Sequence, residues 1–401
     1  MARYQLYVLI VSVFTITTVF VITTDNNRYF NAMLNPDVRP VSSRFLLSKD
    51  APVKLKGKTV RSSDNDTLLP YSKSEEWRRL VKGCQFVKFA DTETFPAHKN
   101  SSVTAGSDTK YFVDKLLDSR GNAKDVWGHS VVINNPLSTF SVVEPGGPNG
   151  CVERRLSPAV KTSRLRGCHA AINAGFFGHN PGPDLGACMG NVVTDGKRIQ
   201  DTGGVQNANF GIRKDGTIVV GYLSEMDVLQ EDNPFVQLVT GVIWLVRNGT
   251  VYVKESKTKD CGSLQEYGTM DEFVDVLSAR TAVGHDVHGR VVLVQIDGNT
   301  EERGLSLWEF AEFLLTLGVV NAVNLDGGGS ATLVLDGTVA NYPADHCAND
   351  HNQTWHCMRE VSTILCAHDP EDQMTSDCRI VKTYTCLKVT VLCTILSWIL
   401  Q

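Results

Sequence analysis

Apolar and polar positions along the chain predict mostly β-structure from Tyr111 onward. Short apolar or alternating runs of this kind are typical of strands. They cover Val131–Ile133, Thr139–Val143, Ala170–Asn173, Arg280–Gly284, Arg290–Ile296 and Val319–Leu325. Three further stretches contain an Asp-Gly or Asn-Gly pair between two such runs, which predicts hairpins over Asn209–Tyr222, Val242–Val253 and Ala331–Tyr342.

One segment has a clear helical pattern. Ser306 and Glu309 are spaced as a capping box, and Gly318 stands where a helix would end. Between them, one face is apolar, with Leu307, Phe310, Ala311, Leu314 and Leu315. We therefore expect a helix over 306–317 packed on one side of an α+β domain, whose mixed, mostly antiparallel sheet dominates and whose helices are few.

The pattern divides the chain into four regions. Residues 1–24 hold Arg3 and the apolar run Leu6–Ile22, which is typical of a signal peptide and leaves an uncleaved signal anchor open. Residues 25–106 are polar and aperiodic, so we expect an arm or pro-segment there. Residues 107–368 form the predicted catalytic domain. Residues 369–401 are a Cys-containing tail with a short apolar end, Val389–Leu400, too short to cross a bilayer alone.

Composition narrows the class of protein. The 401 residues carry a formal net charge of −5 with both signs interspersed, so no nucleic-acid partner is expected. Eleven cysteines indicate an oxidising compartment, where most would pair and an odd one would remain. Four sequons support the secretory route, at Asn65, Asn100, Asn248 and Asn352. Membrane association through either terminus and oligomer formation both stay open.

The most unusual stretch is Asp326–Ser330, which follows an apolar run and contains three consecutive glycines. Such glycines weaken a strand, so their bare backbone points to close approach by a ligand. Their amides could meet an anionic or sugar oxygen beside the Asp326 carboxylate. The alternative is a tight turn with an Asx cap.

Four segments share one design, in which an apolar run delivers a polar side chain next to glycine: Asn173–Phe177, Arg280–Gly284, Asp297-Gly298 and Asp326–Ser330. Four such segments in one domain suggest a single pocket. Arg280 suits a phosphate, Asn173 a sugar hydroxyl, and the two carboxylates suit glycoside cleavage. A structural ion pair for Arg280 and a turn role for Asp297 are the alternatives. Phe176 and Phe177 fit the core better than a sugar platform.

Other enzyme classes lack their motifs. The chain has no phosphate-binding P-loop, no His-Glu-x-x-His and no Gly-x-Ser-x-Gly. Cys347, His351, His356 and Cys357 could imitate a zinc site. In a secreted chain, a Cys347–Cys357 disulfide is the better interpretation. We expect neither a metal nor a cofactor.

At these motifs the sequence resembles the phosphodiester glycosidase family. The matching stretches are Thr139–Pro148, Asn173–Phe177, Gln206–Gly211, Asn233–Leu238, Ala279–Asp286 and Asn321–Ala331, in the family's order over roughly 139–366. The family motifs map onto Asn173, Arg280, Thr281, Asp297, Asp326, Gly328 and Ser330. The individual roles are our inference: we expect Asp326, Asp297 and Arg280 to be catalytic. We expect a substrate-binding set with the adjoining glycines included: Asn173, Gly175, Thr281, Gly327, Gly328, Gly329 and Ser330.

The resemblance also implies a reaction. Such enzymes remove N-acetylglucosamine from GlcNAc-α-phospho-mannose on glycans of lysosomal hydrolases, which exposes mannose 6-phosphate. Phosphorylated high-mannose glycans would be the partners, and the Golgi lumen, or secretion, the location. Two alternatives remain at this stage: a secreted glycan- or phosphate-binding module without catalysis, and a metal-dependent phosphodiesterase with Asp297 and Asp326 as ligands.

Four disulfides complete the expectations. The family pattern implies Cys151–Cys188, Cys168–Cys366 and Cys347–Cys357. To these we add Cys84–Cys261, which would tie the arm to the catalytic domain.

Overall fold

The computed structural model describes residues 84–99, 107–117, 121, 123–347 and 356–370. The chain divides into two compact units, Met1–Pro70 and Tyr71–Gln401, and every described residue belongs to the second. The predictions for residues 1–24 and for most of the arm and the tail lie outside the described residues. Among the helices that are described, none has both the length and the apolar character needed to cross a membrane.

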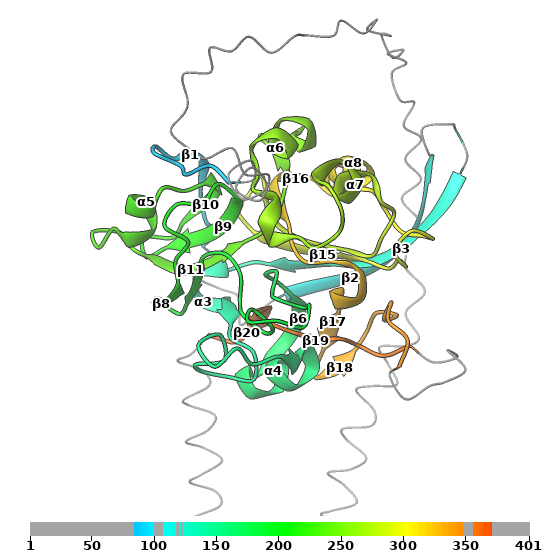
Figure 1. Cartoon of the computed structure of the whole chain (residues 1–401), viewed down its shortest axis with the longest axis horizontal. Helices are drawn as coiled ribbons and strands as arrows, with labels where there is room; N and C mark the ends of the chain where they lie inside the picture. The colour runs from blue at the N-terminus through cyan, green and yellow to red at the C-terminus, as the bar shows by residue number, and fades with distance from the viewer. Residues whose placement is uncertain (1–83, 100–106, 118–120, 122, 348–355, 371–401) are drawn as a thin grey trace, which may run out of the picture. The chain divides into compact units, whose positions relative to one another are not determined.

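Antiparallel sheets make up most of the described unit (Figure 1). The largest sheet has seven strands, in the order β13 (Thr250–Val251), β12 (Trp244–Arg247), β16 (Val319–Asn324), β14 (Arg280–Asp286), β15 (Val291–Ile296), β3 (Ala123–Ile133) and β2 (Ser107–Leu117). The second has six, in the order β1 (Asp91–Pro96), β10 (Thr217–Tyr222), β9 (Ala208–Arg213), β11 (Phe235–Thr240), β7 (Val192–Thr194) and β8 (Lys197–Gln200).

The third sheet has five strands, in the order β18 (Thr338–Val339), β17 (Leu333–Leu335), β6 (Cys168–Asn173), β20 (Ile364–His368) and β4 (Phe140–Val143). A short ladder joins β19 (Glu360–Val361) to β5 (Ser157–Pro158). Every ladder between these strands is antiparallel. The sheet-rich α+β prediction is therefore confirmed.

The helices are short and lie outside the sheets. They are α3 (Pro136–Thr139), α4 (Ala159–Arg166), α5 (Glu225–Leu229), α6 (Val253–Lys259), α7 (Met270–Asp275) and α8 (Leu307–Thr316), with 3₁₀ turns at η1 (Gly262–Leu264) and η2 (Gly328–Ser330). Helices α7 and α8 lie together beside the seven-stranded sheet, and α4 lies against the five-stranded sheet (Figure 1).

The predicted hairpins form, and two of them, at 242–253 and 331–342, have shorter strands than the sequence suggested. At Asn248-Gly249 and Asp336-Gly337 both residues have positive φ, between 46° and 73°. A two-residue turn of this kind matches the twist of the flanking strands. The 242–253 prediction was too long because Val253 begins α6, and Thr139 ends α3 instead of opening β4. Asn248 itself is exposed, so its sequon faces solvent; the other three sequons lie outside the described residues.

Helix α8 shows how local sequence fixes a packed element. The Ser306 side chain accepts a hydrogen bond from the Glu309 N–H, and the Glu309 carboxylate accepts one from the Ser306 N–H. Its buried face includes Phe310, Phe313 and Leu314, and the helix packs on β12 and β16. The sequence pattern did not place Phe313 on the buried face. It placed Leu315 there, and Leu315 is only partly buried.

The end of the predicted arm belongs to the fold. Strand β1 pairs with β10 along its whole length, from Asp91 opposite Tyr222 to Pro96 opposite Thr217. Cys84 is bonded to Cys261, as expected. The sequence places the first periodic segment near Tyr111 because β1 is a polar edge strand without strong alternation.

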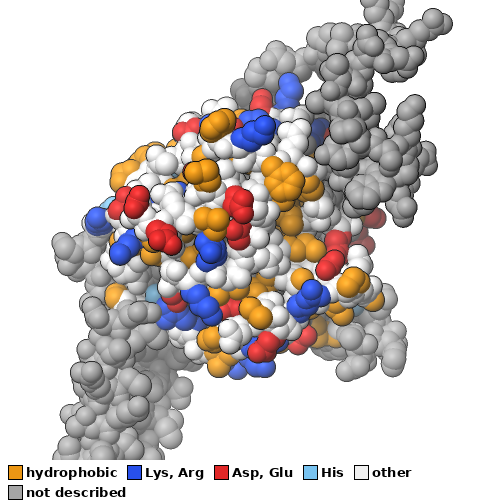
Figure 2. All heavy atoms as spheres, turned by 60° about the vertical axis from the view of Figure 1, so that its left-hand side comes forward, with side chains coloured by type: hydrophobic (Ala, Val, Ile, Leu, Met, Phe, Trp, Pro, Cys, Tyr) orange, Lys and Arg blue, Asp and Glu red, His pale blue; other side chains and the backbone are white. Residues whose placement is uncertain are grey.

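The exposed face carries charge of both signs. Figure 2 shows acidic and basic side chains interspersed among apolar ones on the face in view. This distribution matches the one inferred from the sequence.

We predict that Ser306→Ala lowers the free energy of unfolding by about 1 kcal/mol, because it removes the N-cap of α8. Urea denaturation measures this loss, and Ser306→Thr, which keeps a capping hydroxyl, is the control. Equal stability of the alanine variant and the unchanged chain would show that the cap contributes nothing.

Candidate active site

Three strand ends meet at one edge of the fold. Strand β6 ends at Asn173, β16 ends at Asn324, and β14 begins at Arg280. Because β14 and β16 are antiparallel, with Ala282 opposite Asn324, the start of one lies beside the end of the other. The backbone continues this pairing, since the Leu325 N–H donates to the Thr281 carbonyl at 2.8 Å. The glycine-rich loop therefore starts from a fixed position.

The Asn173 side chain joins these three strands. Its Nδ2 donates to the backbone carbonyl of Asp326 at 2.6 Å. Its Oδ1 accepts from the Thr281 hydroxyl at 3.0 Å and from the Thr332 N–H at 3.1 Å. Asn173 is almost fully buried, and both ends of its amide are engaged. The geometry thus makes Asn173 a support for Asp326, whereas the sequence suggested a contact with sugar hydroxyls.

A cavity of about 260 Å³ opens in front of this junction. Asp326 and the three glycines after it form one side, and Phe176 and Phe177 contribute apolar wall. Both rings are mostly buried, so they serve the core and the cavity at once. The loop after η1 closes another side.

Asp326 is the carboxylate at the centre of the cavity. Its side chain is half-buried, and the surrounding protein atoms raise its pKa to about 6. Burial is the main cause, because removal of water disfavours the charged form. The Ser330 hydroxyl, the Arg359 charge and the Gly327 N–H oppose the rise, and the Glu266 charge adds to it. The Gly327 N–H donates directly to Asp326 Oδ1 at 3.0 Å.

Arg280 brings a buried positive charge to the cavity. Its Nε donates to the Leu305 carbonyl at 2.9 Å, and its Nη2 donates to the carbonyls of Phe273 and Val276. Burial lowers its pKa to about 9, which leaves the guanidinium charged at neutral pH. No carboxylate forms a salt bridge with it within the described residues, and its Nη1 donates to none of them. The alternative of a structural ion pair therefore does not describe Arg280.

Arg359 is a second cation in the cavity, at a position that no sequence motif marks. Its Nε and Nη2 donate to the two carboxylate oxygens of Asp345, at 2.7 and 3.0 Å. A Cβ on Gly329 would collide with both members of this pair. The third glycine of the motif therefore leaves room for the Arg359–Asp345 pair beside the loop.

The glycine amides are less available than the sequence suggested. The Gly327 N–H is used by Asp326 Oδ1, and the Gly328 N–H donates to the Ala279 carbonyl at 2.9 Å. This leaves the Gly329 N–H as the amide of the three that can serve a ligand. Gly328 has φ of +56°, a conformation that few residues other than glycine adopt readily.

The second carboxylate in the cavity is Glu266 and not the predicted Asp297. Glu266 lines the cavity, where it accepts from the His179 N–H at 3.3 Å and from Asn180 Nδ2 at 2.8 Å. Asp297 is absent from the lining, and its Oδ1 accepts from Gln295 Nε2 at 2.9 Å.

Strand alternation explains the position of Asp297. Ile296 pairs with Arg280, so these two side chains share a face of the sheet. The next residue along the strand points to the opposite face. Asp297 is consequently directed away from the face that Arg280 occupies, and the structure does not bring it to Asp326.

The remaining predicted site residues lie outside the cavity lining, next to the residues that form it. Gly175, Thr281 and Ser330 do not line it. The Gly175 N–H donates to the Thr363 hydroxyl at 3.0 Å, which fixes the loop after β6. The Ser330 hydroxyl is fully buried and has no hydrogen-bond partner of normal geometry within the described residues, yet it lowers the pKa of Asp326.

All four predicted disulfides are present: Cys84–Cys261, Cys151–Cys188, Cys168–Cys366 and Cys347–Cys357. The last one closes the chain between Asp345 and Arg359 and so supports their pairing. His356 Nδ1 donates to the Ala344 carbonyl at 3.0 Å, and His351 lies outside the described residues. In the described part of the chain, no three His, Cys, Asp or Glu side chains are grouped as metal ligands.

Comparisons with known proteins agree with this architecture. The sequence profile of the phosphodiester glycosidase family matches residues 166–368. The chain is 49% identical over 315 residues to the N-acetylglucosamine-1-phosphodiester alpha-N-acetylglucosaminidase of Bos taurus, a match that covers 78% of this chain and 57% of the relative. The human protein of the same name is 49% identical over 314 residues, with 78% and 58% covered. The chain thus spans less than two thirds of the length of these relatives.

A solved structure gives the same result. The catalytic domain of zebrafish N-acetylglucosamine-1-phosphodiester alpha-N-acetylglucosaminidase, auto-inhibited by its pro-peptide, is 44% identical with a TM-score of 0.66. The match covers 77% of this chain and 100% of the zebrafish chain. On the strength of the profile, the identities and the shared fold, the chain belongs to the phosphodiester glycosidase family.

Proposed function

We propose that this chain is a hydrolase that removes N-acetylglucosamine from GlcNAc-α-1-phospho-6-mannose on the glycans of lysosomal enzymes, exposing mannose 6-phosphate. The observation that carries the proposal is a half-buried carboxylate, Asp326, that shares one cavity with a second carboxylate, Glu266, and with the guanidinium groups of Arg280 and Arg359. The names of the bovine, human and zebrafish relatives support the substrate.

The chemistry of the leaving group suits such a cavity. Cleavage of the bond between the anomeric carbon and the phosphate oxygen releases a phosphate monoester, a far better leaving group than a sugar alcohol. Departure therefore needs little protonation, and the demand for a general acid with a raised pKa relaxes. The protein must hold the phosphate of the substrate in place. It must also position a carboxylate near the anomeric carbon, where positive charge develops.

Arg280 and Arg359 hold the phosphate in this mechanism. Buried guanidinium groups are suited to phosphate because their planar donors match its oxygens. Nη1 of Arg280 has no partner within the described residues. The Gly329 N–H adds a neutral donor. An anionic ligand would also stabilise the charged form of Arg280, whose pKa burial lowers.

Asp326 acts at the anomeric carbon, as nucleophile or as the base for an attacking water. A pKa of about 6 leaves it mostly ionised at neutral pH and more basic than an exposed aspartate. Asn173 and Thr281 position it through the backbone and do not touch the substrate. We assign the role of the second carboxylate, which the sequence suggested for Asp297, to Glu266. The charge of Glu266 raises the pKa of Asp326.

The domain assignment follows the same proposal. Residues 107–368 form the catalytic domain, to which the 84–99 segment of the arm is joined by β1 and by Cys84–Cys261. Residues 25–83 would be the arm or pro-segment, 1–24 the secretory signal or anchor, and 369–401 the tail. Phosphorylated high-mannose glycans in the Golgi lumen would be the substrates.

We predict that Asp326→Asn lowers turnover of GlcNAc-1-phospho-methylmannoside by roughly three orders of magnitude, because the reacting carboxylate is lost. Release of free GlcNAc measures this. Asp297→Asn is the matched control: it removes the same charge after β15, two strands from β16 in the sheet and outside the cavity lining, and should retain most activity.

The folded state of Asp326→Asn should remain intact. Because burial raises the folded-state pKa of Asp326, its stabilising contribution is complete below the unfolded pKa and is lost as pH rises through about 6. At pH 7 the amide removes this cost, so thermal unfolding should occur at or above the normal temperature. Near-normal turnover by Asp326→Asn would rule out its role; ligand bound but never cut by the unchanged chain would indicate a binding module.

We predict opposite shifts of the acid limb of kcat/KM in two variants. Activity should fall as pH drops through about 6, when Asp326 is protonated. Arg359→Gln removes a charge that lowers the pKa of Asp326, so the limb should move to higher pH. Glu266→Gln removes a charge that raises it, so the limb should move to lower pH. Identical limbs in all three proteins would show that Asp326 does not control the profile.

We predict that dialysis against EDTA leaves the rate of GlcNAc release unchanged, because guanidinium groups neutralise the phosphate. The assay compares the dialysed chain with the same chain after addition of Mg²⁺ or Zn²⁺. Loss of activity on dialysis and its recovery with either ion would instead support a metal-dependent phosphodiesterase.

A further inference from the structure

The described residues contain a second cavity, of about 380 Å³, larger than the one at Asp326. Six polar side chains line it: Ser138 of α3, Ser141 of β4, Arg166 of α4, Asp195 in the turn between β7 and β8, Gln237 of β11 and His368 of β20. None of them belongs to the four strand-end segments from which the catalytic site was predicted. Cavities with several convergent polar groups are the usual form of small-molecule sites.

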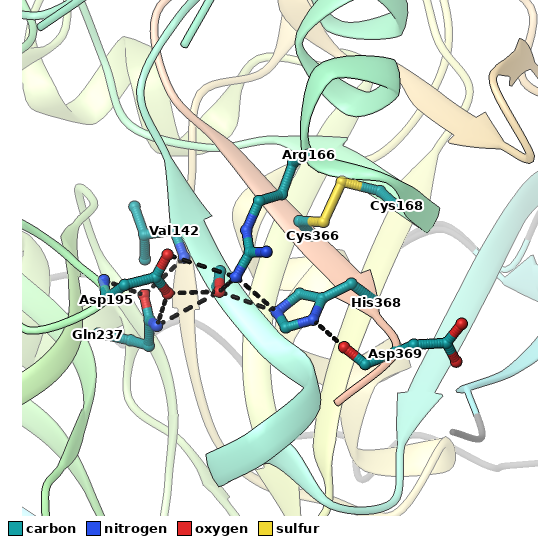
Figure 3. Close-up of polar contacts among 9 residues, drawn as sticks. Val142, Arg166, Cys168, Asp195, Gln237, Cys366, His368 and Asp369 are labelled. Atoms are coloured by element: carbon teal, nitrogen blue, oxygen red, sulfur yellow. Dashed lines mark hydrogen bonds and ion pairs between the residues drawn. A yellow bond between two sulfur atoms is a disulfide. The ribbon is translucent and has the colours of Figure 1, made fainter. Parts of the chain in front are cut away.

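The two cavities lie at opposite ends of one strand pair. Strands β6 and β20 run antiparallel, with Asn173 opposite Ile364 at the catalytic end and Cys168 opposite His368 at the other. At 3.3 Å per residue, the six residues of β6 separate the two ends by about 17 Å. The Cys168–Cys366 disulfide joins the same two strands next to the second cavity (Figure 3). The second cavity is thus separate from the first, and the disulfide holds together the two strands beside it.

Ser141 is the centre of the polar network in the second cavity (Figure 3). Its hydroxyl donates to Asp195 Oδ1 at 2.7 Å and lies 2.9 Å from His368 Nε2. Arg166 Nη2 donates to the Ser141 hydroxyl at 3.2 Å and to Asp195 Oδ2 at 3.3 Å. His368 Nδ1 is 2.7 Å from the carbonyl of Asp369, which fixes the orientation of its ring.

Gln237 connects this network to the sheet. Its Oε1 accepts from the Val142 N–H at 2.8 Å, and its Nε2 donates to Asp195 Oδ1 at 2.7 Å. Ser141, Gln237 and His368 are each less than a tenth exposed. Burial of this many polar groups adds little to stability compared with an apolar core of the same volume. The network is rigid and polar, which are the properties of a preorganised binding surface.

The groups present favour a neutral ligand with many hydroxyls. Each ligand hydroxyl both donates and accepts, and the cavity offers acceptors on Asp195 and, on the exposed Ser138, a hydroxyl that can do either. The Asp195 side chain is 42% exposed, and its two oxygens can accept more bonds than the three they receive. The negative charge of Asp195 would repel an anion, and the positive charge of Arg166 would repel a cation. Leu137, Phe140 and Val236 supply apolar wall for the C–H face of a sugar ring.

We propose that the second cavity is a carbohydrate-binding subsite that takes a neutral hexose unit of a glycan. The choice of a sugar as the ligand rests on the proposed function. The existence of the cavity and of its polar network is independent of that function. A branched high-mannose glycan presents several neutral mannose units besides the phosphorylated one. Occupation of this subsite would hold such a glycan on the protein and favour glycoprotein substrates over small ones.

A blocked cavity tests the proposal. Ser138 is exposed on α3 and lines the second cavity, so Ser138→Trp should fill it without loss of any side-chain hydrogen bond of the network. Lys161→Trp, at an exposed position of α4 outside the cavity, is the matched control. The full secreted chain is titrated with an unphosphorylated high-mannose oligosaccharide, and binding is followed by calorimetry and ligand-observed NMR.

We expect Ser138→Trp to weaken oligosaccharide binding about tenfold or more, while Lys161→Trp changes it by less than about twofold. GlcNAc release from GlcNAc-1-phospho-methylmannoside should stay within about twofold in both variants, and KM for a phosphorylated high-mannose glycan should rise only in Ser138→Trp. Binding that is absent in the unchanged chain, or equal in Ser138→Trp, would overturn the subsite. Failure of the unchanged chain to release GlcNAc contradicts the proposed function instead and leaves the binding result standing.

Discussion

The amide of Asn173 is the constraint on which the rest of the structure depends. It connects the end of β6, the Thr281 hydroxyl of β14 and the carbonyl of Asp326 after β16. A glycine-rich loop would otherwise sample many conformations, because glycine restricts the backbone least. With the loop held at its first residue, the Asp326 carboxylate has a defined position at the wall of the cavity. Burial in that position is also what raises its pKa toward the working range of a base or nucleophile.

Sequence patterns were sufficient for the parts that depend on neighbours along the chain. The capping box at Ser306, the Asn248-Gly249 turn and the buried strand before Asp326 each combine local propensity with local spacing, and all three formed. Three of the four disulfides came from the family resemblance, and Cys84–Cys261 was added as a tether of the arm. Their presence matters for the site, because Cys347–Cys357 supports the segment that pairs Asp345 with Arg359.

The missed residues have a common physical reason. Arg359 and Glu266 reach the cavity through long-range folding of irregular segments, and no periodic pattern marks a side chain that a loop delivers. Asp297 lies outside the cavity lining for a different reason: it follows a strand end and precedes glycine, as Asp326 does, but strand alternation directs it to the other face of the sheet. The position of a residue at a strand end predicts that it lies at the edge of the sheet. The face of the sheet on which its side chain lies depends on the strand register, which the sequence pattern does not show.

A crystal structure of the Asp326→Asn variant with intact GlcNAc-1-phospho-methylmannoside tests the central claim most directly. The account predicts the phosphate within hydrogen-bond distance of Arg280 Nη1 and of the Gly329 N–H, with the side chain at position 326 beside the anomeric carbon. A phosphate bound away from both groups, or an anomeric carbon on the far side of the cavity from position 326, would contradict it.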